Sequence, residues 1–269
     1  MTGATDGVMT RDPATIVAGF CPGESQHPPP AHCQPPIWLP IALLLVGSFV
    51  VRSFNLDLVV QGWFWSAEGG WSLKDASMVG FLYAYGNLPA DAIGLSSLIA
   101  WIGSFVAPQL RKMRFLTCYL ALALIIGPGL LVNATLKDHY GRPRPREVAE
   151  FGGDQKFRPL GEPTFDHHGK SFPSGHAAMG FFWFVPGIYF WPRSRRLAWG
   201  LIGLALLHGG LMGFGRMAQG AHWPSDILWS AGIVYVSAWI LYCILSLRLE
   251  QHTHAAPMIH GWHSSKRPG

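Results

Sequence analysis

The chain has 269 residues, of which 49% are hydrophobic and only 13% charged, and its formal net charge is +5. Soluble domains carry about 25% charged residues. Together with 12 tryptophans and 16 phenylalanines, this composition excludes an ordinary soluble domain and indicates a membrane protein. The positive charge does not indicate nucleic-acid binding, because it lies in short loops and no basic stripe alternates with stacking aromatic residues.

The two ends of the chain differ in composition from its middle. Residues 1–36 include "PGESQHPPPAHCQPP" and lack the apolar core of a signal peptide, which predicts a disordered, proline-rich tail. Residues 250–269 are polar and rich in histidine, and we expect a flexible tail there. Residues 37–249 are predicted to form one membrane domain.

The middle of the chain contains six apolar stretches that approach the length of about 20 residues needed to cross a bilayer. In chain order they cover 37–54, 89–107, 115–136, 174–191, 197–215 and 224–247. Segment 55–88 contains "QGWFWSAEGGW", whose clustered tryptophans predict a chain lying at the membrane interface. Asp91 begins the second stretch, where a helix N-terminus favours an acid. The sequence therefore predicts an all-α fold, a bundle of six transmembrane helices.

The loop charges predict the orientation of this bundle. "RKMR" at 111–114 and "PRSRR" at 192–196 are short basic loops, which remain cytoplasmic. Alternation along the chain then places both termini in the cytoplasm and loops 137–173 and 216–224 on the periplasmic or external face of the inner (plasma) membrane. Loop 137–173 is itself rich in lysine and arginine, and anion binding is one reason for cations on that side.

The first polar cluster on this face is "KDHYGRPRP". Lys137 ends the third span, and Arg142 and Arg144 alternate with the helix breakers that follow it. A turn fixed by proline holds guanidinium groups with little freedom, and such groups suit bidentate capture of a phosphate. The cluster therefore predicts a phosphate-binding turn.

The second cluster is "PSGH", at the start of the fourth span. Pro173 suits a first helical turn, so the amides of Ser174, Gly175 and His176 are expected to form a helix N-terminus that attracts anions.

The third cluster is "GRMAQGAHWPSD", in which Arg216 ends the fifth span and His222 and Asp226 flank the start of the sixth. A carboxylate four residues after a histidine can accept the Nδ1 proton and leave Nε2 as a nucleophile. The three clusters together predict a site for phosphoryl transfer that requires no metal.

These motifs resemble those of the type 2 phosphatidic acid phosphatase superfamily, whose pattern is KxxxxxxRP, PSGH and SRxxxxxHxxxD. Lys137 with Arg144-Pro145, the run 173–176, and Arg216, His222 and Asp226 match that pattern at the family spacings. One position departs from it, because Gly215 stands where the family has a serine.

The resemblance implies a role for each matching residue. His222 is the nucleophile that forms a phosphohistidine, Asp226 orients and supports it, and His176 protonates the leaving group. The phosphoryl group is held by Lys137, Arg144, Arg216, Ser174 and Gly175. No metal or cofactor is expected. The expected partners are a membrane lipid phosphate and the bilayer, without an obligate protein partner.

The substrate and the acceptor stay open at this point. "FGG" followed by an aromatic residue, in the long loop after "GRPRP", resembles the loop of lipid A phosphatases and favours lipid A or undecaprenyl diphosphate. Phosphatidic acid and phosphatidylglycerophosphate are alternatives, and a lipid phosphotransferase uses the same chemistry. The loop itself is either a solvated cap or a reader of a large anionic head group. Less favoured readings are a lipid-binding transporter and a zinc hydrolase built on the chain's histidines.

Overall fold

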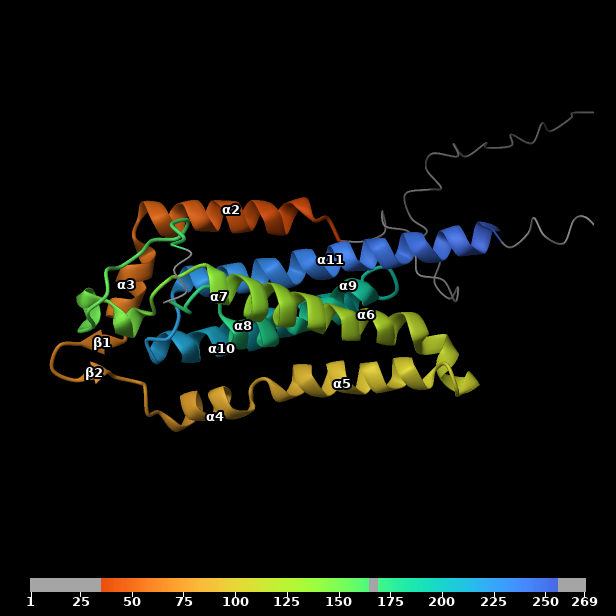
Figure 1. Cartoon of the computed structure of the whole chain (residues 1–269), viewed down its shortest axis with the longest axis horizontal. Helices are drawn as coiled ribbons and strands as arrows, with labels where there is room; N and C mark the ends of the chain where they lie inside the picture. Colours follow the sequence, from red (N-terminus) through yellow and green to blue (C-terminus); the bar gives the residue numbers. More distant parts are fainter. Residues whose placement is uncertain (1–34, 165–168, 256–269) are drawn as a thin grey trace, which may run out of the picture.

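The computed structural model describes residues 35–164 and 169–255, most of which lie in helices that run along one axis (Figure 1). The predicted tails fall largely outside these residues, as do His167 and His168 of the zinc alternative. The last helix runs to Ala255, past the boundary predicted at 249.

The six predicted spans correspond to helical stretches with similar bounds. They are α2 (Trp38–Ser53), α5 (Leu88–Gly103), the continuous run α6 (Arg114–Leu124), η3 (Ile125–Leu136) and α7 (Lys137–His139), the run α8 (Gly175–Gly180), η6 (Phe181–Trp183) and α9 (Phe184–Phe190), then α10 (Arg195–Ala218) and α11 (Pro224–Ala255). All-α architecture is thus confirmed, with one two-stranded hairpin in the described part of the chain.

Judged by length and composition, fewer helices can cross a membrane than the six that the sequence predicts. Three helices of the described chain are long and apolar enough to cross a bilayer, or up to four if the bent pair of α2 and α3 (Leu56–Gly62) counts as one span. The 16-residue α5 is about 24 Å long at about 1.5 Å per residue, against about 30 Å of hydrocarbon. Short helices explain the difference.

Segment 55–88 only partly follows the prediction of an interfacial chain. Asn55 has a left-handed backbone (φ 49°), and α3 turns from α2 by 72° there. The hairpin of β1 (Trp65–Ser66) and β2 (Gly70–Trp71) follows, with Trp65 paired to Trp71. Next, α4 (Ser77–Tyr85) packs along α10, in line with α5, so this part runs beside the bundle (Figure 1).

The run from α8 to α9 forms the centre of the bundle and carries the second predicted cluster. Its buried side chains include Phe182, Val185 and Ile188, and it packs against α10, α11 and η3. A Cβ atom at Gly180 would lie 2.7 Å from the Cα atom of Gly209, so the close approach of α8 to α10 requires glycine. This packing fixes the position of the PSGH segment.

The two ends of the bundle hold different connections (Figure 1). One end holds the α5–α6 connection with η2 (Pro108–Met113) and the α9–α10 connection, which are the two basic loops. The other end holds α3, the hairpin, and a loop with η4 (Pro145–Glu147) and η5 (Ala149–Phe151). Val148, Phe151 and Trp223 form a small core under this loop. The loop is therefore packed onto the end that carries the predicted site.

Candidate active site

His222 lies in the connection between α10 and α11, with its side chain buried. Its Nδ1 atom is 2.6 Å from the backbone oxygen of Ser171, and its own backbone oxygen accepts a hydrogen bond from Gln61 Nε2. Because a carbonyl oxygen can only accept, Nδ1 carries the proton and Nε2 keeps its lone pair. This tautomer is the one that a nucleophilic histidine needs.

The carboxylate of Asp226 lies beside His222. Its Oδ2 atom lies 3.6 Å from His222 Nδ1, beyond hydrogen-bond length, and accepts hydrogen bonds from Ser171 Oγ (2.6 Å) and Trp223 N (2.9 Å). The nearest acceptor for the Nδ1 proton is the Ser171 oxygen, so Asp226 acts on His222 as a neighbouring charge, and its role of orienting and supporting His222 stays a prediction. Asp226 also fixes Ser171, whose carbonyl oxygen holds the imidazole.

The position of Arg142 is a further correction. Its guanidinium donates to Asp226 Oδ1 (2.6 Å) and to Asp57 Oδ2 (2.7 Å), and it is completely buried. Ser225 completes the network, since its N–H and hydroxyl both donate to Asp57. Arg142 is thus not a phosphate ligand, as the Arg-Pro turn had predicted, but the cation between two buried carboxylates.

The charges of this buried network stabilise one another. Burial alone lowers the pKa of Arg142, but Asp226 and Asp57 outweigh it and raise that pKa. Burial lowers the pKa of His222, and the charges of Arg216 and Lys137 lower it further, against the raising effect of Asp226. The structure therefore favours a charged Arg142 and a neutral His222 at neutral pH.

His176 lies on the other side of the site, in the first turn of α8. Its ring stacks on Tyr83 of α4 with 4.9 Å between centroids and 16° between planes. The guanidinium of Arg216 lies 4.9 Å from the same Tyr83 ring. Tyr83 therefore links the candidate acid to one candidate phosphate ligand, and α4 brings it there.

Three cations converge on this region from three segments. The charge of Arg144 interacts with the charges of Lys137 and Arg216, so the three groups lie near one another. The ring of His176 interacts in the same way with Lys137, Arg216 and His222. In the described part of the chain, the Nε atoms of Arg144 and Arg216 are buried and have no hydrogen-bond partner. Buried donors are nearly always paired, so these two N–H groups are suited to an anion.

The PSGH segment is held in place by hydrogen bonds of its own. Ser174 caps α8 by accepting from Ala177 N, and Ser230 on α11 bonds both the N–H and the carbonyl oxygen of Ser174. Both the side chain and the N–H of Ser174 are thus occupied, and α8 begins at Gly175, so Pro173 precedes the helix and does not form its first turn as predicted. The amides that remain for an anion are those of Gly175 and His176. A Cβ atom at Gly175 would clash with the side-chain amide of Asn133, which is itself bonded to the Pro128 oxygen.

The two glycines of the site should therefore differ in their tolerance of substitution. We expect Gly175→Ala to lower the melting temperature and the rate of phosphate release, because overpacking costs about 1–3 kcal/mol. Gly215→Ser, which restores the family serine, should leave both unchanged or improved, because the nearest atom to a Cβ there is 3.7 Å away on Leu82. Thermal unfolding and phosphate assays on both variants would contradict this if the losses were equal.

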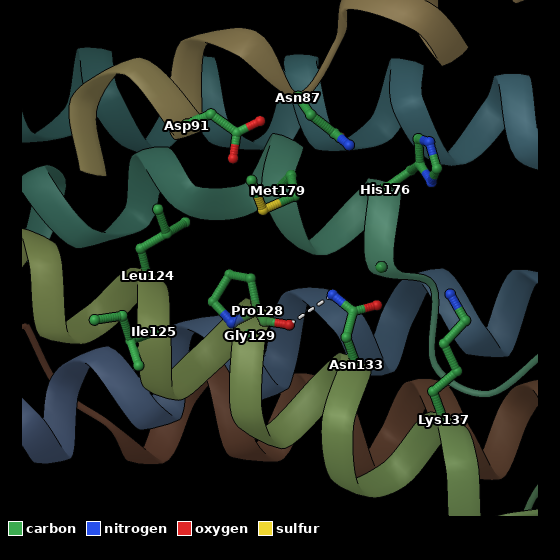
Figure 2. Close-up of a pocket in the computed structure, with 11 residues that line it drawn as sticks. Asn87, Asp91, Leu124, Ile125, Pro128, Gly129, Asn133, Lys137, His176 and Met179 are labelled. Atoms are coloured by element: carbon green, nitrogen blue, oxygen red, sulfur yellow. Dashed lines mark hydrogen bonds between the residues drawn. The ribbon is translucent and has the colours of Figure 1, made fainter. Parts of the chain in front are cut away.

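A cavity of about 430 Å³ adjoins His176 and Lys137 (Figure 2). Its walls come from α5, from the η3 run and from α8. Pro128 interrupts the regular hydrogen bonding of η3, and Asn133 Nδ2 donates to the Pro128 oxygen at 2.8 Å. The wide π-helical turns of η3, of a kind common at functional sites, place Asn133 and Lys137 on the cavity wall.

Sequence reasoning missed several residues that shape this site. Asp57, Tyr83 and Ser171 stand outside the three clusters, and Asp57 and Tyr83 come from the segment predicted to lie at the interface. Asp57 could have been noticed in the sequence, since an acid in an apolar segment usually has a partner. Nothing in the sequence pattern indicates a role for Tyr83 or Ser171.

Comparison with known proteins identifies the family. The family model described as "PAP2 superfamily" matches residues 116–250.

The chain is 32% identical over 204 residues to a protein named lipid A 4'-phosphatase from Francisella tularensis subsp. novicida (strain U112). The match covers 73% of this chain and 89% of that protein. It is 37% identical over 138 residues to a lipid A 4'-phosphatase of Rhizobium leguminosarum, covering 49% and 54%. A lipid A 1-phosphatase of Rhizobium johnstonii (strain DSM 114642 / LMG 32736 / 3841) is 31% identical over 172 residues, covering 63% and 57%. No solved structure matches significantly. The family model and the first of these relatives confirm the resemblance seen in the motifs: the chain belongs to the PAP2 superfamily.

Proposed function

We propose that this protein removes a phosphate from lipid A, through a phosphohistidine on His222 and without a metal. The superfamily and the relatives make the chain a phosphatase that acts on lipid phosphates, and three long apolar helices make it a membrane protein. Lipid A is the leading substrate because relatives from two bacterial genera are named for it. Undecaprenyl diphosphate is the second candidate.

In the first step, His222 Nε2 attacks phosphorus and the bond between phosphorus and the leaving oxygen breaks. Burial, with the charges of Arg216, His222 and Lys137, lowers the pKa of His176 to about 4 in the free protein, and a bound phosphate dianion beside the ring opposes this shift by stabilising the imidazolium. His176 then gives its proton to the leaving oxygen, so the lipid leaves as a neutral alcohol. The Nδ1–H of His222 remains bound to the Ser171 oxygen, which stabilises the positive charge formed on the ring. Asp226 adds to this stabilisation from 3.6 Å.

In the second step, water attacks the phosphohistidine, His176 accepts a proton from the water, and His222 is released with inorganic phosphate. Lys137, Arg144 and Arg216 neutralise the phosphoryl oxygens throughout, with the amides of Gly175 and His176. The observation that carries this assignment is the pair of buried, unpartnered Nε–H groups of Arg144 and Arg216.

We place the site on the periplasmic side of the inner membrane, with both termini in the cytoplasm. The support is the charge of loops 111–114 and 192–196, which share the end of the bundle opposite the site. We further propose that all six helical stretches cross the membrane, with the short α5 and the buried run Gly175–Phe190 held by their neighbours.

A phosphate-release panel with the purified full chain tests this function. We expect the highest kcat/KM with lipid A, full activity in a chelator, and inhibition by vanadate, which mimics phosphorus under attack. Activity that a chelator abolishes and Zn²⁺ or Mg²⁺ restores would refute the metal-free mechanism.

The same panel separates the alternatives. Higher kcat/KM with phosphatidic acid or phosphatidylglycerophosphate would refute the lipid A assignment, and transfer of phosphate to an added lipid alcohol in preference to water would indicate a phosphotransferase. No release from any lipid phosphate would favour a lipid-binding transporter.

A further inference from the structure

The cavity beside the candidate acid has two facing walls of different chemistry (Figure 2). Asn87 and Asp91 lie on the α5 side, while Asn133 and Lys137 lie on the facing η3–α7 run. Apolar side chains complete the lining: Leu124, Ile125, Pro128 and Met179. A volume of about 430 Å³ is in the range of pockets that bind small molecules.

The place of His176 indicates which part of the substrate enters this cavity. In an in-line displacement the leaving oxygen departs opposite the nucleophile. His176, the proposed proton donor to that oxygen, lines the cavity, whereas His222 does not. The cavity therefore lies on the leaving-group side of the phosphate.

The polar groups of the cavity are short of partners. Asp91 belongs to the first turn of α5 and lines the cavity, and it is exposed, so its carboxylate is accessible to a ligand. Asn87 Oδ1 is buried and has no hydrogen-bond partner in the described chain. The Asp91 carboxylate can only accept, whereas the Asn87 side chain accepts through Oδ1 and donates through Nδ2, so the wall of α5 is suited to hydroxyl and amide groups and, because of Asp91, unsuited to a second anion.

The surroundings of the cavity are apolar. Ile125 on its lining is 51% exposed, and Leu88, Leu95 and Leu130, near the lining residues in the chain, are also more than half exposed. In a bilayer these side chains face acyl chains. A polar pocket on helices that also expose apolar side chains matches a sugar ring that carries acyl chains.

We propose that this cavity is the subsite for the leaving alcohol, and that Asp91 and Asn87 select the hydroxyl and amide groups of an acylated sugar. A diphosphate lipid leaves as an anionic monophosphate, which the Asp91 carboxylate repels. The inference rests on the proposed function and decides between its two substrates: a glycolipid phosphomonoester is favoured over a polyprenyl diphosphate.

The experiment compares kcat/KM for lipid A and for undecaprenyl diphosphate in the purified full chain and in Asp91→Asn and Asp91→Ala. The wild type should prefer lipid A. Asp91→Ala should lose at least about tenfold on lipid A, the order expected for one hydrogen bond to a charged acceptor. Both variants should keep or gain activity on the diphosphate, because the repulsion is gone.

Ser96→Ala is the matched control, since Ser96 lies on α5, is exposed and does not line the cavity. It should leave both rates and their ratio unchanged. A ratio unaltered in both Asp91 variants, or a wild type that prefers the diphosphate, would overturn the subsite while leaving the phosphatase assignment intact. A wild type inactive on both lipids would overturn the proposed function as well.

Discussion

His222→Ala is expected to lower phosphate release by at least about four orders of magnitude, as removal of a catalytic nucleophile does elsewhere. The reason is that the buried His222 has its Nδ1 atom fixed by the Ser171 carbonyl oxygen, which leaves the Nε2 lone pair free to attack phosphorus. The lost hydrogen bond should cost only about 1–3 kcal/mol of stability. The variant should therefore still unfold cooperatively, and labelled substrate should leave no acid-labile phosphate on it.

His139→Ala is the control for this prediction, because His139 is an exposed histidine at the same end of the bundle. It should retain activity. His176→Ala should be severely impaired on lipid A but less so on an ester whose leaving group needs no proton. Wild-type rates in His222→Ala on lipid phosphates would contradict the mechanism.

The pH dependence of wild-type activity gives a second test of His222, because it reports the protonation state of that side chain. His222 must be neutral to attack, and burial lowers its pKa below the ordinary value near 6.5. The loss of kcat/KM caused by protonation of His222 should therefore lie below about pH 6.5. The pKa of His176, the proposed acid, is lowered to about 4, so any fall of kcat/KM with rising pH should be reduced in His176→Ala on an ester whose leaving group needs no proton. A kcat/KM that already declines as pH falls from about 8 to about 7, in the wild type and in His176→Ala alike, would contradict a lowered pKa of His222.

The sequence predicts which candidate site residues lie near one another better than it predicts the residues that hold them in place. Lys137, His176, Arg216 and His222 come together as expected, since each sits at the end of an apolar stretch and a bundle brings such ends to one side. The role of Arg142 could not be predicted, because its partner Asp57 lies 85 positions away on α3. Local spacing carries no information about such pairs.

The helices illustrate the same limit. Apolar composition predicts where the helical stretches begin and end to within a few residues, except at the end of the last helix, which continues to Ala255. It does not reveal that Pro128 and Asn133 open the η3 run beside the site, or that α4 packs on α10. Those features depend on contacts between distant segments.

Arg142→Ala should be strongly destabilising, by about 3–5 kcal/mol, because it leaves Asp57 and Asp226 buried without their cation. Activity should fall with it, since Asp226 holds Ser171 and thereby His222. Thermal unfolding of the purified protein measures the first effect. Arg146→Ala is the matched control, because that arginine lies in the same loop but is exposed and should cost less than about 0.5 kcal/mol.

A double-mutant cycle with Asp57→Asn separates the buried network from a direct role in phosphate binding. If Arg142 serves the two carboxylates, adding Asp57→Asn to Arg142→Ala should restore part of the lost stability, because the asparagine oxygen can still accept from Ser225 N and one unpaired charge is gone. KM should change less than kcat, because the network fixes the nucleophile and does not touch substrate. If Arg142→Ala instead keeps its stability and raises KM as Arg144→Ala does, then Arg142 binds phosphate, as the Arg-Pro turn had first predicted.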